Sequence, residues 1–385
     1  MVIATLDDQY QQTLHLLLKH NQELKETAIK RVLVLYEEEN FFIGDTCILF
    51  DRFRLCKRFF GEHVTIDMNC LNKKYTTLYQ AFARNNPHIN KIYNLDYAEV
   101  DFEQYEVVIY IAYNEAVLLK ELHTRYADRI HNGQFKVAVF SFSALLLAPR
   151  REVETVFYPY EALLDFLQGV LGEPHELYLE PAEREWGNTW LREHHLQEGE
   201  RLFILLDSSS SREKLWPLDV YFEILLYVLK QENIKVLIFD ENNMGKEDFY
   251  KKWLGSKLMK KIIVAKGLTL REAMPILGAD NTRFILGPCT GMVHCASAIY
   301  NNDVSNGKPV EQVPLMITYT GKWDADSWWG NAPLINCLLL RREEGDIRLT
   351  TLSALDPAAR TNYDDRLGCN DYSAGMIINY IKTKL

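Results

Sequence analysis

Residues 284–298 read FILGPCTGMVHCASA, the densest structural signal in the sequence. A short apolar run ends at Gly287-Pro288, Thr290-Gly291 follows, and a segment with His294 and several small residues then continues without Gly or Pro. Because glycine and proline interrupt regular structure, the pattern predicts a buried strand, a tight turn and a helix. Such a strand–turn–helix unit is typical of a parallel sheet that helices cover.

The same unit recurs on both sides of this stretch. Further short, β-branched-rich runs in this half of the chain are Leu202–Asp207, Lys235–Asp240, Lys261–Ala265 and Pro314–Thr320. Helix-compatible segments separate them. Strands that are apolar on both faces and alternate with helices indicate a parallel sheet buried between two helical layers.

The first half of the chain repeats this architecture. Its predicted strands are Arg31–Tyr36, His63–Asp67, Val107–Tyr113 and Lys136–Phe142. Residues 9–29 precede them, with apolar positions at helical spacing and no Gly or Pro, and predict an amphipathic helix.

A chain of 385 residues corresponds to two or three domains at roughly 150 residues each, and the two strand series favour two. Residues 172–200 lose the apolar runs and gain Pro, Glu and His, as a linker with one helix would. The predicted organisation is a helical extension (1–30), a first Rossmann-like domain (31–172), a linker (173–200), a second Rossmann-like domain (201–365) and a C-terminal helix that packs back across the domains (366–385).

The predicted fold class is therefore α/β, with two doubly wound parallel-sheet domains that face a central cleft. Sheets of this kind bind ligands at the carboxyl ends of their strands, so we expect the site there.

Composition and charge exclude several classes of protein. With 48% hydrophobic and 25% charged residues the chain is globular, and its net charge of −10 disfavours general nucleic-acid binding. The apolar, uncharged stretch of residues 137–149 is shorter than the roughly 18 residues of a membrane span. The first residues lack the pattern of a secretory signal. We therefore expect a cytoplasmic protein.

Seven cysteines are scattered without a CxxC pair, which argues against a disulfide framework and a zinc ribbon. We expect them to be mostly reduced and buried. They are Cys47, Cys56, Cys70, Cys289, Cys295, Cys337 and Cys369.

The first candidate site follows the first strand, where the loop EEENFFIGD (residues 37–45) ends in Gly44-Asp45 and a helix begins. A carboxylate at this edge of the sheet could be a general base toward a hydroxyl. Alternatively, Asp45 caps the helix and Gly44 only permits the turn.

A second candidate site opens the second domain. Ser208–Ser211 and Lys214 precede Trp216-Pro217 and an apolar helix. Small hydroxyl residues, free backbone N–H groups and a lysine suit a diphosphate. The alternative is a flexible serine loop with a solvated lysine.

The third candidate lies in residues 284–298. Gly291 permits close backbone approach, the helix N-terminus carries partial positive charge, and His294 lies about one turn in. The alternative is a core helix with a hydrogen-bonded histidine. A metal cluster of Cys289, His294 and Cys295 matches no standard zinc spacing.

Together these segments resemble glycosyltransferase family 9, the heptosyltransferases that transfer a sugar from ADP-heptose to the lipopolysaccharide core and have the GT-B fold. The resemblance covers most of residues 30–325. It rests on four motifs in the family's order: Gly44-Asp45, Ser208–Ser211 with Lys214-Leu215-Trp216-Pro217, Gly267-Leu268-Thr269-Leu270-Arg271-Glu272, and Cys289-Thr290-Gly291-Met292-Val293-His294.

The resemblance implies a role for each candidate. Asp45 would be the catalytic base, with Gly44 and Arg52 on the acceptor side. The donor's phosphates would lie at Ser208, Ser209, Ser210, Ser211, Lys214, Cys289, Thr290, Gly291 and His294. No metal and no cofactor is implied, and an ADP-sugar is the favoured co-substrate.

Two positions depart from the family. Cys289 stands where the family has an aspartate that contacts the sugar, and Glu37–Glu39 make the loop before Gly44 acidic. A basic group follows on the next helix, with a solvated helical face as the alternative: Arg52, Arg54, Lys57 and Arg58. Trp323, Trp328 and Trp329 either stack on a base or sugar or pack a domain edge.

The sequence thus predicts a metal-independent, inverting glycosyltransferase that moves a heptose or related sugar from a nucleotide diphosphate to a hydroxyl of a glycan, lipid-linked or peptide acceptor. No nucleic acid and no stable membrane insertion are expected. The alternative is a catalytically inactive GT-B-like protein that binds a nucleotide or sugar or serves as a scaffold. A nucleotide-sugar epimerase is less favoured because the motifs are those of transferases.

Overall fold

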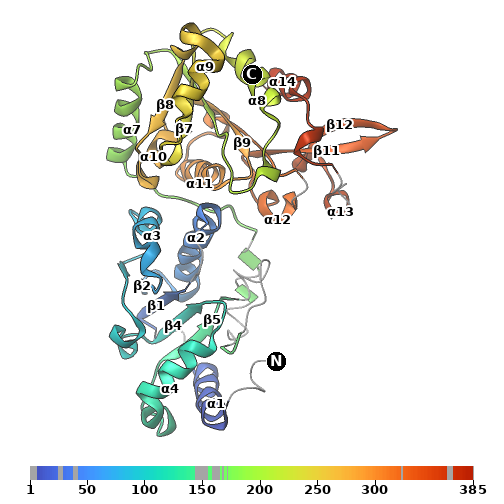
Figure 1. Cartoon of the computed structure of the whole chain (residues 1–385). Helices are drawn as coiled ribbons and strands as arrows, with labels where there is room; N and C mark the ends of the chain where they lie inside the picture. The colour runs from blue at the N-terminus through green and yellow to red at the C-terminus, as the bar shows by residue number, and fades with distance from the viewer. Residues whose placement is uncertain are drawn as a thin grey trace. The chain divides into compact units, whose positions relative to one another are not determined.

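The computed structural model describes residues 7–24, 29–37, 42–143, 155–157, 165–166, 169–170, 172–321, 324–361 and 367–384. Contacts divide the chain into two compact units. The first comprises residues 1–42 and 49–171, and the second comprises residues 43–48 and 172–385. Each unit contains one sheet (Figure 1).

The first unit contains a parallel sheet in the order β3-β2-β1-β4-β5. Its strands are β1 (Arg31–Tyr36), β2 (Thr65–Cys70), β3 (Lys91–Tyr93), β4 (Val107–Ile111) and β5 (Ala138–Ser141). The chain winds outward from β1 to β3, returns to β4 beside β1 and continues outward to β5. This is the doubly wound order, and it places a change of direction between β1 and β4.

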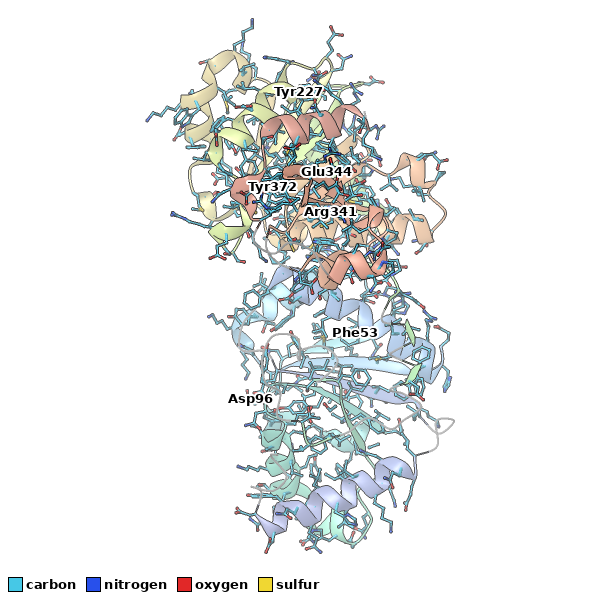
Figure 2. All side chains as sticks on the ribbon, turned by 90° about the vertical axis from the view of Figure 1, so that its right-hand side faces the viewer. Phe53, Asp96, Tyr227, Arg341, Glu344 and Tyr372 are labelled. Atoms are coloured by element: carbon cyan, nitrogen blue, oxygen red, sulfur yellow. The ribbon has the colours of Figure 1, made fainter. Side chains whose placement is uncertain are left out.

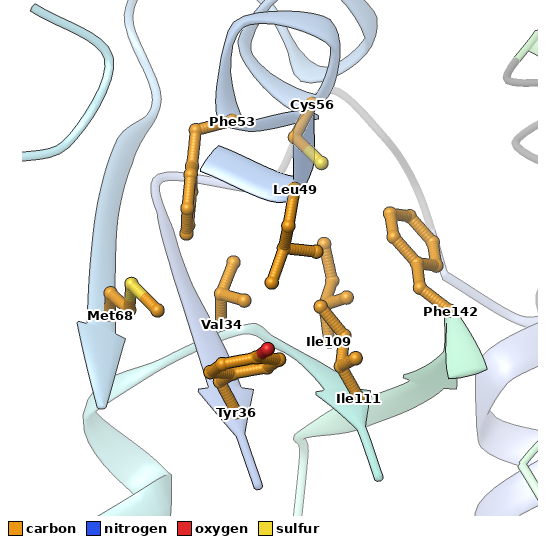
Figure 3. Close-up of a pocket in the computed structure, with 9 residues that line it drawn as sticks. All are labelled: Val34, Tyr36, Leu49, Phe53, Cys56, Met68, Ile109, Ile111 and Phe142. Carbon is orange, nitrogen blue, oxygen red and sulfur yellow. The ribbon is translucent and has the colours of Figure 1, made fainter. Parts of the chain in front are cut away.

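Helices cover both faces of this sheet. They are α1 (Asp8–Gln22), α2 (Ile43–Phe60), α3 (Thr76–Ala83) and α4 (Ala116–His131), with 3-10 turns η3 (Lys73–Tyr75), η4 (Tyr97–Glu99) and η5 (Phe102–Gln104). Because side chains alternate along a strand, Leu33 and Leu35 of β1 pack with α1 and α4. Val34 and Tyr36 point to the opposite face, toward α2. There they line a small apolar pocket together with Phe53 (Figure 3).

Helix α1 is tied to an outer strand of this sheet. The side-chain amide of Asn21 donates to the carbonyl of Val139 at 2.7 Å and accepts the N–H of Val139 at 2.9 Å. Leu14 and Leu17 are buried in the same core. The amide of Asn21 therefore satisfies backbone groups of β5 that an uncovered strand would leave to solvent.

Glu115, the N-cap residue of α4, organises the end of β5. Its fully buried carboxylate accepts hydrogen bonds from the hydroxyls of Ser141 and Ser143. It also accepts the N–H groups of Val156 at 2.8 Å and Phe157 at 3.0 Å. Burial raises the pKa of Glu115 above its ordinary value, although these four hydrogen bonds oppose the shift.

The second unit contains a seven-stranded sheet in the order β12-β11-β10-β9-β6-β7-β8. Its strands are β6 (Arg201–Leu205), β7 (Ile234–Asp240), β8 (Ile262–Lys266), β9 (Thr282–Pro288), β10 (Leu315–Tyr319), β11 (Ile335–Glu343) and β12 (Asp346–Thr351). All neighbouring strands are parallel except the pair of β11 and β12. The chain changes direction between β6 and β9.

The helices of this unit are α7 (Pro181–Glu193), α8 (Leu218–Leu229), α9 (Lys246–Met259), α10 (Leu270–Leu277), α11 (Gly291–Ser305), α12 (Ala325–Trp329), α13 (Pro357–Thr361) and α14 (Ala374–Lys382). The 3-10 turns are η6 (Arg212–Lys214), η7 (Glu241–Asn243), η8 (Val310–Gln312), η9 (Leu352–Ala354) and η10 (Cys369–Asp371). α8 and α14 pack on one face of the sheet. Trp216 belongs to this core, stacked on Tyr319 with 3.7 Å between ring centroids.

Strands β11 and β12 form a hairpin that projects from the sheet (Figure 1). Glu344 and Gly345 connect them with φ of 53° and 93°, and two such left-handed residues match the twist of a two-residue hairpin. Arg341 lies directly opposite Arg348, and Figure 2 labels Arg341 and Glu344. Like charges directly opposite each other disfavour pairing, so buried neighbours such as Leu340 stabilise the hairpin.

The predicted fold class of two doubly wound parallel-sheet domains is confirmed. The first helix is shorter than expected: α1 ends at Gln22, whereas the sequence pattern predicted a helix to residue 29. Residues 173–200, expected as a linker with one helix, contain α7, which packs on α10. The C-terminal helix, expected to cross both domains, packs on α8 of the second unit. The short β3 and the hairpin were not expected.

All seven cysteines are buried and free, as expected. Within the described residues, no helix is both long and apolar enough to cross a bilayer.

The raised pKa of Glu115 predicts a pH dependence of stability. Between about pH 4.3, the ordinary glutamate value, and the raised pKa, the folded state binds more protons than the unfolded state. The free energy of unfolding should therefore fall as the pH rises through this window. Glu115→Gln should remove this slope and cost about 1–3 kcal/mol, because its amide group meets the N–H donors of Val156 and Phe157.

Chemical unfolding of the full chain at a series of pH values measures both effects. Glu121→Gln, on the same helix but partly exposed, serves as the control. An unchanged slope in Glu115→Gln would contradict the assignment.

Candidate functional site

Strands β6 and β9 are parallel neighbours in the sheet, so the segments that follow them begin at the same edge. Residues 207–214 follow β6 and residues 289–294 follow β9. A Cβ on Gly287 would lie 2.6 Å from the Cβ of Leu206, so only glycine permits this approach. The change of direction in the sheet thus brings two of the predicted segments together.

The N-terminus of α11 lies at this edge of the sheet, directly after β9. Thr290 is its N-cap residue in an extended conformation, and neither a side-chain cap nor an acidic residue occupies the first turn. The helix continues for 15 residues, and Met292–Asn302 are all buried. Its first N–H groups and its macrodipole therefore favour a negative group at Thr290 and Gly291.

Cys289 and Lys214 adjoin this helix end. Cys289 is buried, and burial raises the pKa of its thiol, while the nearby Lys214 ammonium opposes that shift. Lys214 is the last residue of η6. Its charge acts on Cys289, which directly precedes the N-cap residue of α11. A neutral thiol thus occupies the position where the resemblance implies a carboxylate, and the Lys214 ammonium lies near enough to act on it.

His294 lies in an aromatic cluster. Its ring is 2% exposed and stacks on Trp329, with 4.1 Å between centroids and 10° between planes. Trp328 approaches edge-on at 5.9 Å, and His175 lies 6.0 Å away. These neighbours fix the plane of the imidazole. Two of the three expected tryptophans therefore pack around the expected histidine, and Trp323 lies outside the described residues.

Gly44 and Asp45 lie in the first turn of α2, after the N-cap residue Phe42. Residues 43–48 belong to the second unit by their contacts. A Cβ on Gly44 would lie 2.7 Å from the His294 ring, and a Cβ on Gly291 would collide with Ile43. Both glycines of the predicted motifs thus permit close approach, and Asp45 follows directly.

The structure describes only part of the region that was expected to bind the acceptor. The side chain of Arg52 and residues 38–41 lie outside the described part of the chain. Glu37 accepts hydrogen bonds from the hydroxyls of Tyr97 at 2.8 Å and Tyr110 at 2.7 Å. Arg54 forms two hydrogen bonds with the buried carboxylate of Asp51, at 2.9 and 3.0 Å. Arg54 therefore pairs with a carboxylate of the same helix, α2.

The serine segment divides into different roles. Ser211 is the N-cap residue of η6 and accepts the N–H of Glu213 at 3.4 Å. Ser209 accepts the N–H of Ser211 at 3.4 Å, whereas Ser210 is exposed. These hydroxyls shape the turn that presents Lys214.

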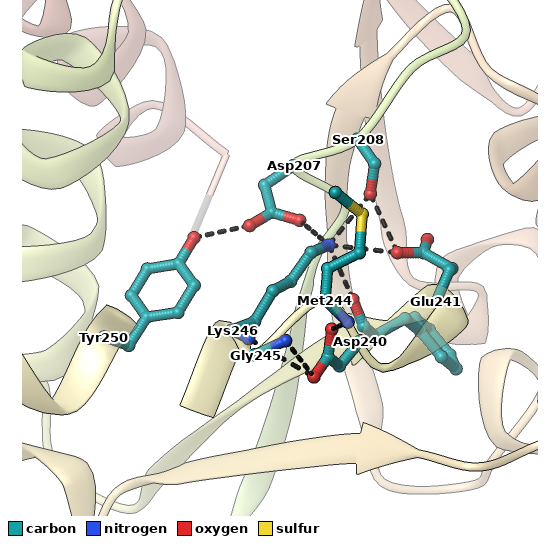
Figure 4. A network of polar contacts seen from close by, with 9 residues as sticks. Asp207, Ser208, Asp240, Glu241, Met244, Gly245, Lys246 and Tyr250 are labelled. Atoms are coloured by element: carbon teal, nitrogen blue, oxygen red, sulfur yellow. Dashed lines mark hydrogen bonds and ion pairs between the residues drawn. The ribbon is translucent and has the colours of Figure 1, made fainter. Parts of the chain in front are cut away.

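Ser208 belongs to a polar network around Lys246 (Figure 4). The Lys246 ammonium donates to Asp207 at 2.6 Å, Ser208 at 2.9 Å, the carbonyl of Phe239 at 2.7 Å and Glu241 at 3.0 Å. Burial lowers the pKa of Lys246, but Asp207 and Glu241 raise it, and the net direction is upward. The ammonium is therefore held by protein oxygens and is not a phosphate ligand.

The same network presents a carboxylate at the carboxyl end of β7. Glu241 follows β7 directly, its side chain is 41% exposed, and it also accepts the hydroxyl of Ser208 at 2.9 Å. Asp240 is occupied by the N–H groups of residues 244–246. Of these two carboxylates, Glu241 is the exposed one. Sequence reasoning missed it, although an acidic residue directly after a predicted strand was the available signal.

The motif of residues 267–272 holds two helices together. Thr269 and Glu272 form a reciprocal cap on α10, with Glu272 accepting the N–H of Thr269 at 2.7 Å. Arg271 is bidentate to Glu183 at 2.8 and 2.6 Å and donates to the carbonyl of Tyr178 at 2.8 Å. The motif therefore anchors α10 to α7.

Among the described residues, no three His, Cys, Asp or Glu side chains gather into a set that could hold a metal ion. Metal independence stays a prediction.

Comparisons with known proteins return solved structures only. No family model and no curated protein matches the chain. A glycosyl transferase of family 9 from Veillonella parvula DSM 2008 matches with a TM-score of 0.59 and 14% identity, over 94% of this chain and 97% of that chain. The ADP-heptose lipopolysaccharide heptosyltransferase II of E. coli matches with a TM-score of 0.56 and 11% identity, over 92% and 98% of the two chains.

A third structure, the E. coli heptosyltransferase WaaC with ADP, matches with a TM-score of 0.50 and 11% identity, over 92% of this chain and 100% of that chain. At these identities the likeness establishes the fold. The chain has the GT-B fold, and these structures include members of the family that its motifs resemble.

The Arg271–Glu183 pair is nearly buried, with 8% and 12% side-chain exposure. Arg271→Ala should lower the free energy of unfolding by about 3–5 kcal/mol, because it leaves a buried carboxylate uncompensated. Arg192→Ala removes the exposed pair with Glu185 and should cost at most about 1 kcal/mol. Thermal or urea unfolding of both variants checks this difference. Equal losses would contradict the anchoring role.

Proposed function

We propose that this chain is an inverting, metal-independent glycosyltransferase that takes a sugar from a nucleotide diphosphate. One observation supports this most: the uncapped N-terminus of α11 and the Lys214 ammonium both act at the buried Cys289, beside the carboxyl end of β9. Positive groups preorganised at this edge suit a diphosphate leaving group. The GT-B fold supports sugar transfer by analogy with other proteins of this fold.

In this proposal the donor lies across the ends of β6, β7 and β9. The diphosphate meets Thr290, Gly291 and Lys214. The ribose hydroxyls donate to Glu241, since an acidic residue at the end of the second strand binds the ribose in folds of this class. The carboxylates around Lys246 make the β7 side unfavourable for phosphate, so the two parts of a nucleotide are separated by charge.

Asp45 is the proposed base. As the acceptor oxygen bonds to the anomeric carbon, its proton passes to the Asp45 carboxylate, and the bond from the anomeric carbon to the phosphate oxygen breaks. Attack opposite the leaving group inverts the anomeric centre. The negative charge that develops on the diphosphate is stabilised by Lys214 and by the first N–H groups of α11.

Substrate classes complete the proposal. An ADP-sugar, with a heptose or related sugar, is the favoured donor, and the acceptor is a hydroxyl of a glycan, lipid-linked or peptide molecule. We also propose a cytoplasmic location and no binding of nucleic acid. The neutral thiol of Cys289 leaves the sugar without the carboxylate that the resemblance implies, which favours a donor recognised through fewer hydrogen bonds at this position.

A thermal-shift panel with ADP, GDP, UDP, CDP and dTDP, each with and without magnesium, tests the donor site. A diphosphate at about 100 times its dissociation constant should stabilise the protein by about 2.7 kcal/mol. Lys214→Ala should weaken that nucleotide about tenfold or more, because it removes a charge-assisted contact. The matched control Arg212→Ala removes the same charge two residues away and should change little. Equal effects, or no response to any diphosphate, would contradict the proposed site.

Asp45→Asn tests the base. Turnover of the donor in the presence of acceptor should fall by about 10²- to 10⁴-fold, while the affinity for the nucleotide is retained. A residue that only stabilises the helix end would instead cost about 0.3–1 kcal/mol of stability and leave turnover intact. Steady-state kinetics and thermal unfolding of the same variant separate the two roles.

The alternative function is a binding or scaffold protein that has lost catalysis. The neutral thiol of Cys289, in place of the aspartate that the resemblance implies, is the observation that favours it. A nucleotide that shifts the melting temperature without slow hydrolysis of the corresponding sugar nucleotide would support the binding protein.

A further inference from the structure

Three carboxylates gather around Lys246 at the carboxyl ends of β6 and β7, and two of them have both oxygens in use (Figure 4). Asp207 accepts the Lys246 ammonium with Oδ1 and the hydroxyl of Tyr250 with Oδ2, at 2.6 Å each. Asp240 accepts three backbone N–H groups at the start of α9, one with Oδ1 and two with Oδ2. These two carboxylates are therefore fully engaged by the protein.

Glu241 is the third carboxylate, and only one of its oxygens is in use. The Lys246 ammonium and the hydroxyl of Ser208 donate to the same atom, Oε2, at 3.0 and 2.9 Å. Among the described residues no group donates to Oε1, and the side chain is 41% exposed. One acceptor oxygen of the cluster is therefore left for a ligand.

Lys246 determines the orientation of this carboxylate. Its side chain is 14% exposed, and its ammonium contacts four oxygens between 2.6 and 3.0 Å, from Asp207, Ser208, Phe239 and Glu241. The ends of β6 and β7 thus hold the ammonium, and the ammonium holds Oε2 of Glu241. Without it, the carboxylates of Asp207 and Glu241 would repel each other, and the exposed glutamate would turn toward solvent.

The remaining oxygen suits a hydroxyl better than a metal ion. A divalent cation such as Mg²⁺ or Ca²⁺ takes about six or more oxygen ligands. Here the oxygens of Asp207 and Asp240 already accept hydrogen bonds, and Oε1 of Glu241 is a single acceptor. A single carboxylate oxygen can accept one hydroxyl proton in a charge-assisted hydrogen bond.

The location of Glu241 matches the ribose of the proposed donor. β6 lies between β7 and β9, so the ends of β7 and β9 are two strand spacings apart, or about 10 Å. A nucleoside diphosphate covers a comparable length from its 2′-hydroxyl to its second phosphate. In doubly wound folds, an acidic residue after the second strand accepts the ribose 2′-hydroxyl.

We propose that Lys246 is a positioning residue that holds Oε1 of Glu241 for the 2′-hydroxyl of the donor, so that the site selects ribonucleoside over 2′-deoxyribonucleoside diphosphates. This inference rests on the proposed function and deepens it, because it names the sugar of the nucleotide as ribose and excludes dTDP-sugars as donors. A lysine with a merely structural role would stabilise the ends of β6 and β7 without affecting that selection.

Isothermal titration of the full chain with ADP and 2′-deoxy-ADP tests the selection; if another base binds in the diphosphate panel, the corresponding pair replaces them. The wild type should bind the ribonucleotide about tenfold or more tightly, because the deoxy compound lacks a hydrogen bond to a charged group. Lys246→Met and Glu241→Ala should each bring this ratio close to one. The two changes together should lose no more selectivity than either alone, because Lys246 acts through Glu241.

Two controls separate positioning from folding. The preference for ADP over AMP should be unchanged in Lys246→Met, which verifies that this variant folds with its diphosphate site intact. Lys266→Met removes another lysine–glutamate pair, with Glu247 at 2.6 Å, at the end of the neighbouring β8, and should keep the wild-type ratios. If Lys246→Met unfolds, Lys246→Gln takes its place and should lower the selectivity for ribose in the same direction.

The outcomes distinguish this inference from the proposed function. A wild-type ratio close to one, a panel in which dTDP binds best, or a ratio that survives the loss of Lys246 overturns the inference and leaves the diphosphate site standing. Failure of every diphosphate to bind contradicts the proposed function, and the inference with it.

Discussion

The adjacency of β6 and β9 is the constraint on which the candidate site depends. A doubly wound sheet must reverse its direction once, and the two strands at the reversal send their following loops away from each other, which leaves room between them. In the second unit, Gly287 at the end of β9 packs directly against Leu206, which follows β6. Lys214 belongs to the segment after β6, and α11 follows β9. The positive groups come from separate segments, and the topology of the sheet brings them to one edge.

Charge is distributed unevenly along that edge. Lys246 neutralises part of a carboxylate cluster at β7, and burial together with Asp207 raises the pKa of Tyr250, which keeps that phenol neutral. The β7 side is thus rich in acceptors and poor in positive charge, whereas the β9 side has a helix N-terminus, a lysine and a neutral thiol. In the proposed donor site, this division would suit the hydroxyls of a ribose at the β7 side and a diphosphate at the β9 side.

Much of the architecture was predictable because buried parallel strands need apolar residues on both faces, as in β1 and β7. The three-residue β3 (Lys91–Tyr93) has no such run, and β12 is a half-exposed strand whose polar residues resemble a loop. At the site, glycines and the helix start of residues 284–298 were visible as local patterns. The roles of Ser208, Glu241 and Arg271 were not, because each depends on a partner from a distant segment: Lys246, Ser208 and Glu183 respectively.

The tie between Asn21 and Val139 has a consequence for the order of folding. These two residues are 118 positions apart, yet α1 docks on a strand that is made much later. While the chain is being synthesised, the two elements on which α1 packs, α4 and β5, leave the ribosome long after it. Until then its apolar side, with Leu14 and Leu17, must wait in solvent or on a chaperone. Helix α1 is therefore made before the strands of its unit and placed after the last of them, where it covers the outer edge of β5.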